Sequence, residues 1–135
     1  MTERTGGCLC GAVRYRLTAA PVQTMLCHCK NCQKTSGSAV STIALMARDA
    51  VEIEGETKTY AYAGDSGRTL AVRFCPTCGS PVFVEIHAMP DMLSVKVGTL
   101  DDTSWFKPAV QIWTDSAQDW FPVPGDCPGF AKNSG

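Results

Sequence analysis

Apolar and polar residues alternate along several short segments of the chain. In the segment 93–98, Leu93, Val95 and Val97 alternate with polar neighbours. A period of two residues is typical of β-strands that bury one face of a sheet. The same alternation, or a run of β-branched and aromatic residues, predicts further strands. They are expected over 13–17, 69–75, 80–86 and 110–114, with two more strands around a glycine-containing turn over 51–64.

The segment 39–50 fits two kinds of element. Its Val, Ile and Ala residues match the stripe of a helix, but its Val, Thr and Ile content favours the strand that we predict, with a short helical turn after Cys32. The sequence shows no long helical pattern, so a parallel βαβ architecture is not expected. We therefore predict a mainly β protein with one domain over residues 1–135. The Pro- and Gly-rich tail from about residue 121 is expected to be irregular.

The charge of the chain is nearly balanced. Its 12 basic and 13 acidic residues give a formal net charge of −1 and a pI of about 6.1. This balance argues against nucleic acid or an anionic membrane as a partner. No apolar run has the length of a signal-peptide core or of a transmembrane helix, so we expect a soluble, cytoplasmic protein. A monomer and a homodimer are both compatible with the sequence.

The chain contains eight cysteines. In a reducing cytoplasm, cysteines are more often metal ligands or reactive thiols than disulfides. Cys8 and Cys10 form one pair among glycines, and Cys75 and Cys78 form a knuckle followed by Gly79. Two such pairs supply the four ligands of tetrahedral zinc, whose sulfurs lie roughly 3.8 Å apart. We predict that these four cysteines bind a structural zinc, which would tie the early and middle strands together.

A third cluster consists of Cys27, Cys29 and Cys32, called the triad below. Three protein ligands leave one position of tetrahedral zinc open, which is typical of a catalytic site. Zinc with three thiolates has a net charge of −1 and is a weak Lewis acid for water, but it suits a fourth, soft thiolate. The triad therefore predicts thiol chemistry rather than hydrolysis.

A fourth ligand from the chain would close this site. Cys127 is the main candidate, because the irregular tail could fold back onto the triad. His28 lies between two ligands and faces away from them on an extended backbone, so we expect it to pack beside the site. His87 is expected to be an ordinary histidine at a strand end. The sequence leaves Cys127 and an external thiol as alternatives.

Five segments, in order, resemble the glutathione-dependent formaldehyde-activating enzyme family. They are GGCLCGAVRY, CHCKNCQKTSGS, FCPTCGSPVF, VGTLDD and PAVQIWTDSAQDW, and the resemblance runs from about Gly6 to Trp120. It implies an Mss4-like fold of several coiled antiparallel β-sheets, stabilised by zinc. It implies two zinc ions per chain, one structural at the two cysteine pairs and a second at the triad. The implied activity is that of a carbon–sulfur lyase, which adds glutathione to formaldehyde and forms S-(hydroxymethyl)glutathione.

The chain departs from the family pattern at two positions. It has Gln33 where members often carry arginine, and Gln111 where they often carry histidine. If either side chain contacts the substrate in relatives, glutathione recognition here differs. His28 or a nearby hydroxyl is a candidate proton donor, and two lysines are candidate positive charges near the substrate. These polar residues, each more simply explained as turn, capping or solvated residues, are Thr35, Ser36, Ser38, Lys30 and Lys34.

Several other interpretations compete with the enzyme. Trp113 and Trp120 could line a ligand pocket, although core packing is the simpler explanation for an aromatic side chain. A non-catalytic interaction or chaperone-like module of Mss4-like fold is the main alternative function, but it does not need an incomplete metal site. Nucleic-acid binding lacks a basic patch. A redox thiol sensor would oxidise the triad to a disulfide.

Overall fold

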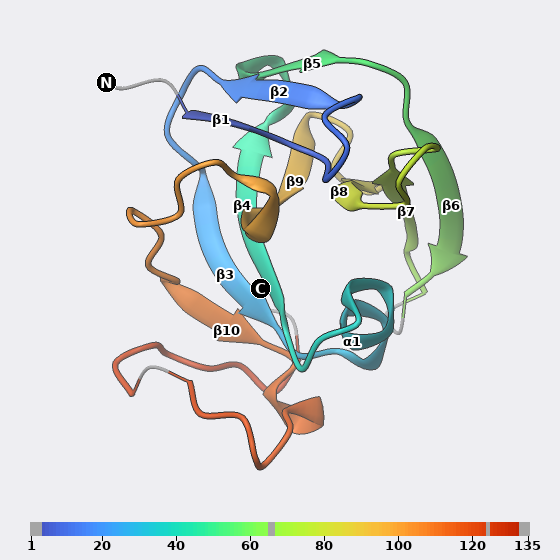
Figure 1. Cartoon of the computed structure of the whole chain (residues 1–135). Helices are drawn as coiled ribbons and strands as arrows, with labels where there is room; N and C mark the ends of the chain where they lie inside the picture. Colours follow the sequence, from blue (N-terminus) through green and yellow to red (C-terminus); the bar gives the residue numbers. More distant parts are fainter. Residues whose placement is uncertain (1–3, 65–66, 124, 133–135) are drawn as a thin grey trace.

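A computed structural model describes residues 4–64, 67–123 and 125–132. Two β-sheets make up most of it (Figure 1). The smaller sheet has the order β1 (Arg4–Gly7), β2 (Arg14–Leu17) and β5 (Val51–Glu54), and all its strands are antiparallel. In the view of Figure 1 it lies at the top of the molecule.

The larger sheet has seven strands and curls across the molecule (Figure 1). Its neighbours are antiparallel except for the first pair, which is parallel. From one edge to the other it contains β10 (Val110–Ile112), β3 (Gln23–Cys27), β4 (Ser41–Ala47), β9 (Met92–Lys96), β8 (Pro81–Ile86), β7 (Thr69–Phe74) and β6 (Lys58–Ala63).

The α-helix of the described residues, α1 (Lys30–Ser36), follows β3 directly. Short 3₁₀ turns occupy Arg48–Ala50, Val97–Thr99 and Thr114–Ser116. The described part of the chain contains no helix long and apolar enough to cross a membrane.

The strands predicted from alternation are all present, and the mainly β fold class is confirmed. The segment 39–50 contains β4, as predicted. The helical turn expected after Cys32 is corrected in position, because α1 begins at Lys30 and includes that cysteine. Strands β1 and β3 were not predicted, since the first is Gly-rich and the second shows no clear alternation.

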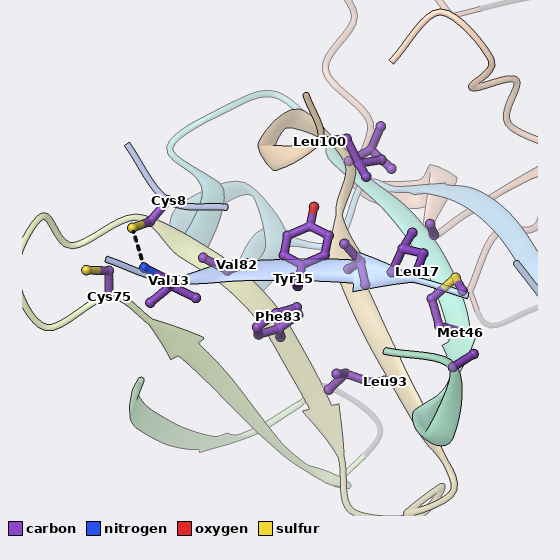
Figure 2. Close-up of a cluster of buried hydrophobic side chains, with 14 residues drawn as sticks. Cys8, Val13, Tyr15, Leu17, Met46, Cys75, Val82, Phe83, Leu93 and Leu100 are labelled. Atoms are coloured by element: carbon purple, nitrogen blue, oxygen red, sulfur yellow. Dashed lines mark hydrogen bonds between the residues drawn. The ribbon is translucent and has the colours of Figure 1, made fainter. Parts of the chain in front are cut away.

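The main core lies between the two sheets (Figure 2). Tyr15 of β2 packs edge-on against Phe83 of β8, with ring centroids 5.2 Å apart. The Tyr15 hydroxyl forms a hydrogen bond of 2.7 Å with the Thr99 hydroxyl, so its polar end is satisfied. Leu17 and Met46 complete the centre of this cluster and are fully buried.

The prediction of a sheet with one buried face needs correction for the middle strands. On β9, Leu93 and Val95 face the main core, but Ser94 and Lys96 on the opposite face are buried as well. A second, smaller hydrophobic cluster lies on that opposite face and contains Cys27 and Cys29. Both faces of the sheet are therefore covered, and the second face carries the candidate site.

Candidate metal centres

Four cysteines from two distant turns meet at one end of the main core. Cys8 and Cys10 lie in the connection between β1 and β2, and Cys75 and Cys78 lie between β7 and β8. Their four sulfurs all lie within 4.8 Å of one another. The Cys8 and Cys10 sulfurs are 3.6 Å apart, and those of Cys10 and Cys75 are 3.7 Å apart. These separations are close to the roughly 3.8 Å between ligands of tetrahedral zinc, so the cluster fits that ion.

The backbone around these four cysteines turns as the sequence predicted. Gly79 has a φ of 80°, and its N–H donates to the Cys75 carbonyl at 2.8 Å. A left-handed residue of this kind favours glycine. The backbone N–H of Val13 donates to the Cys8 sulfur at 3.2 Å. The Ser80 hydroxyl, 3.2 Å from the Cys78 sulfur, lowers the pKa of Cys78 to about 5, which favours the thiolate that a metal needs.

The triad is assembled by the end of β3 and the start of α1. Cys27 is the last residue of β3, Cys29 is the N-cap of α1, and Cys32 lies in the first turn of the helix. Their sulfurs lie within 4.8 Å of one another, and the Cys32 N–H donates to the Cys29 sulfur at 3.2 Å. Hydrogen bonds from the Cys27 and Cys32 thiols lower the pKa of Cys29 to about 3. The triad could hold a metal ion, and its donor set fits zinc.

The described residues supply no fourth ligand to the triad. Cys127 is buried in the tail, but its sulfur is not part of either cysteine cluster. His28 points to Gln111, whose side-chain oxygen lies 2.9 Å from the His28 Nε2 atom. His87 follows β8 and also stays outside the triad. An external thiol as the fourth ligand stays a prediction.

A cavity of about 320 Å³ opens onto the triad. Its wall is the second face of the seven-stranded sheet. On β4, Ile43 and Leu45 line it, whereas the alternate residues Ala44 and Met46 belong to the main core. The paired residues of the neighbouring strands extend the same face, because Ile43 pairs with Lys96. The curl of the sheet thus makes a concave surface with the triad in its lining.

Lys96 is the functional candidate that sequence reasoning missed. It lines the cavity, is only 8% exposed, and its Nζ donates to the Ser41 hydroxyl at 2.8 Å and to the Ser36 hydroxyl at 3.3 Å. Burial lowers the pKa of Lys96, and the negative charge of the triad acts in the opposite direction. In the sequence, its place on the polar side of an alternating strand indicated a solvated lysine, and only the second buried face shows otherwise.

The comparison with family models gives a match over most of the chain. Residues 3–116 match the model of the glutathione-dependent formaldehyde-activating enzyme, which spans both cysteine clusters and the cavity-lining strands. The chain belongs to this family. Family membership supports an activity of the glutathione-dependent formaldehyde-activating type.

Two further comparisons were made. A crystal structure of a Rhodobacter sphaeroides protein has the same fold, with a TM-score of 0.58 and 20% sequence identity. The alignment covers 93% of this chain and 99% of that protein. At this identity the likeness concerns the fold alone. The search of curated proteins found no match.

The two departures from the family pattern lie beside the cavity, not in its lining. Gln33 donates to the carbonyls of His28, at 2.6 Å, and of Ser116, at 2.9 Å. Gln111 contacts the His28 ring and donates to the Cys127 carbonyl at 3.1 Å. Gln33 therefore links the C-terminal segment to the backbone of His28, and Gln111 links it to the His28 ring.

Most of the other polar candidates from the sequence bond locally or are exposed, and one of them contacts Lys96. The Thr35 hydroxyl donates to the Asn31 carbonyl at 2.8 Å, as a helix residue often does. Ser36 touches Lys96, but the remaining candidates are exposed and do not line the cavity; they are Lys30, Lys34 and Ser38.

The two tryptophans considered for the pocket differ. Trp113 lines the cavity, and its φ of 58° is a left-handed conformation that is costly for a bulky side chain. Trp120 is 70% exposed and is not part of the lining. Strained residues of this kind concentrate at functional sites, so we include Trp113 in the candidate site.

Proposed function

We propose that this family member is a zinc-dependent carbon–sulfur lyase that adds a thiol, glutathione or a similar one, to a small aldehyde such as formaldehyde. The observation that carries the proposal is a cluster of three cysteine sulfurs at the wall of a cavity, with no fourth ligand grouped with them among the described residues. A module that only binds a partner has no need of that combination. The proposed cofactors are two zinc ions, one structural and one at the triad. The cytoplasmic location stays a prediction from cysteine usage.

The proposed reaction balances without a further reactant. The thiol sulfur forms a bond to the aldehyde carbon, the carbon–oxygen double bond becomes single, and the proton lost by sulfur ends on oxygen. Zinc at the triad would supply a soft ion that favours the thiolate form of the substrate at neutral pH. Cys27, Cys29 and Cys32 would hold that ion as thiolates. The apolar wall of the cavity limits water around the reacting atoms.

The first test combines metal content with turnover. Purified reduced protein is expected to contain two zinc ions per chain and to accelerate hydroxymethyl thioether formation from glutathione or another thiol and formaldehyde. The rate is compared with the uncatalysed addition, which is fast, and with protein stripped of zinc. Rates equal to the uncatalysed one for every thiol tried would overturn the proposed function. The control variant is Cys127→Ser, which should keep both zinc ions because its sulfur lies outside the clusters.

Replacing Lys96 by methionine should weaken thiol binding. Three thiolates on zinc carry −1 and a fourth makes −2, so a buried cation beside them offsets charge at a largely buried site. Removing one partner of a buried charge pair costs about 3 kcal/mol or more, which corresponds to roughly a hundredfold rise in KM for the thiol. The measurement is KM for thiol and for formaldehyde, with zinc content determined in parallel.

Two variants sharpen the Lys96 test. Lys96→Arg keeps the charge and should recover part of the loss. Lys58→Met removes an exposed lysine from β6 and should change neither KM. An unchanged thiol KM in Lys96→Met with both zinc ions present would show that Lys96 does not offset the negative charge of the thiolates.

A further inference from the structure

The wall of the cavity is mainly apolar. Its sheet face presents branched aliphatic side chains from three strands, and Trp113 adds an aromatic surface. The aliphatic residues that matter most are Ile43 and Leu45 of β4, Leu70 of β7, and Val84 and Ile86 of β8. Their strand positions agree, because Leu70 pairs with Ile86 and Val84 with Ser94, so they form one continuous face.

Apart from the triad, the charged side chains of the described lining are basic. They are Lys96 and Arg68, and no described Asp or Glu lines the cavity. Lys96 is already bonded to Ser36 and Ser41 beside the triad. The other polar side chains of the described wall are few, namely Asn31, Tyr62 and Ser94, so it offers few hydrogen-bonding groups to a polar substrate body.

The size of the cavity also favours a small apolar ligand. Its volume of about 320 Å³ is at the lower end of the roughly 300–1,000 Å³ of small-molecule pockets. Glutathione carries two carboxylates, one ammonium and two peptide groups. Each polar group that it buried without a partner would cost about 1–3 kcal/mol. An aliphatic body of the same bulk would gain free energy against this wall.

We infer that the cavity selects a thiol with a short apolar body in preference to glutathione. The inference rests on the proposed function, because the triad must receive the thiol sulfur. An acidic group at the far end of the thiol is compatible with the cationic lining. The aldehyde partner stays small, since the thiol body fills most of the cavity.

The test is a series of thiols with formaldehyde. The series consists of ethanethiol, 1-propanethiol and 1-butanethiol, with cysteamine and glutathione as polar members. We expect kcat/KM to rise about fourfold with each added methylene, the value of one buried CH₂. Cysteamine and glutathione should lie below 1-butanethiol. A kcat/KM for glutathione equal to or above that of 1-butanethiol would overturn the inference and leave the proposed function standing.

A binding measurement distinguishes failure of this inference from failure of the proposed function. Side-chain methyl resonances of Ile43, Leu45 and Val84 should shift when 1-butanethiol is added, whereas those of Leu17 in the main core should not. If no thiol is turned over, the proposed function fails, and these spectra still decide about the cavity. Shifts confined to the lining would support apolar selection, and an absence of shifts would overturn it.

A matched pair of variants tests the wall itself. Val84→Thr adds a hydroxyl to the lining at nearly constant shape and should lower kcat/KM for 1-butanethiol about fivefold, more than for glutathione. Val51→Thr makes the same change on β5, at the edge of the main core and outside the lining, and should leave the preference unaltered. Equal effects of the two variants on the preference would contradict the assignment of this wall to the substrate.

Discussion

Cys75→Ser is expected to unfold most of the chain at physiological temperature. Cys75 is fully buried and joins the turn between β7 and β8 to the turn between β1 and β2, which belong to different sheets. A structural zinc binds with about 10–16 kcal/mol, and a domain is typically stable by only about 5–15 kcal/mol. Losing one thiolate therefore removes a share of the stability that the core cannot replace.

The measurement is zinc content together with thermal unfolding followed by circular dichroism. Zinc should fall by at least one ion per chain, and the cooperative transition should move far down or disappear. Cys127→Ser is the matched control, since Cys127 is also buried but contributes its sulfur to neither cluster. A Cys75→Ser protein that retains two zinc ions and melts within a few degrees of the native chain would contradict a structural role for this cluster.

The cysteine clusters could be predicted from the sequence because spacing alone constrains them. Residues two or three positions apart are held near one another by the chain, so each pair is local information. Cys8 and Cys10 could be assigned to the same site as Cys75 and Cys78 because the two pairs together supply the four ligands of tetrahedral zinc. The strands with clear alternation followed from the same local logic, as the agreement at β7 and β9 illustrates.

The cavity could not be predicted, because it depends on how distant strands curl. Ser94 and Lys96 occupy the polar side of β9, and alternation assigns that side to solvent. Lys96 is covered on this face by α1, where the Ser36 hydroxyl accepts from its Nζ, and this contact joins residues 60 positions apart. The partners of Gln33 and Gln111 are set in the same way, by a C-terminal segment that returns to β10.

Cys29→Ser is expected to abolish turnover and to leave the fold almost unchanged. The triad spans only residues 27–32, so a metal there joins segments that are already neighbours in the chain. It lies in the smaller cluster with Ile43, apart from the main core. Serine is also a favoured N-cap, and its hydroxyl can accept the Cys32 N–H as the sulfur does now. The helix α1 should therefore persist without the thiolate.

Zinc content, melting temperature and turnover give this variant a signature opposite to that of Cys75→Ser. Zinc should fall from two ions to one, the melting temperature should change by a few degrees, and the rate should equal the uncatalysed addition of thiol to aldehyde. The contrast matters because a damaged fold also stops catalysis, and only a folded, inactive Cys29→Ser protein places the chemistry at the triad. If Cys29→Ser keeps its turnover while its second zinc is lost, the reaction takes place without the triad, and the proposed function is wrong.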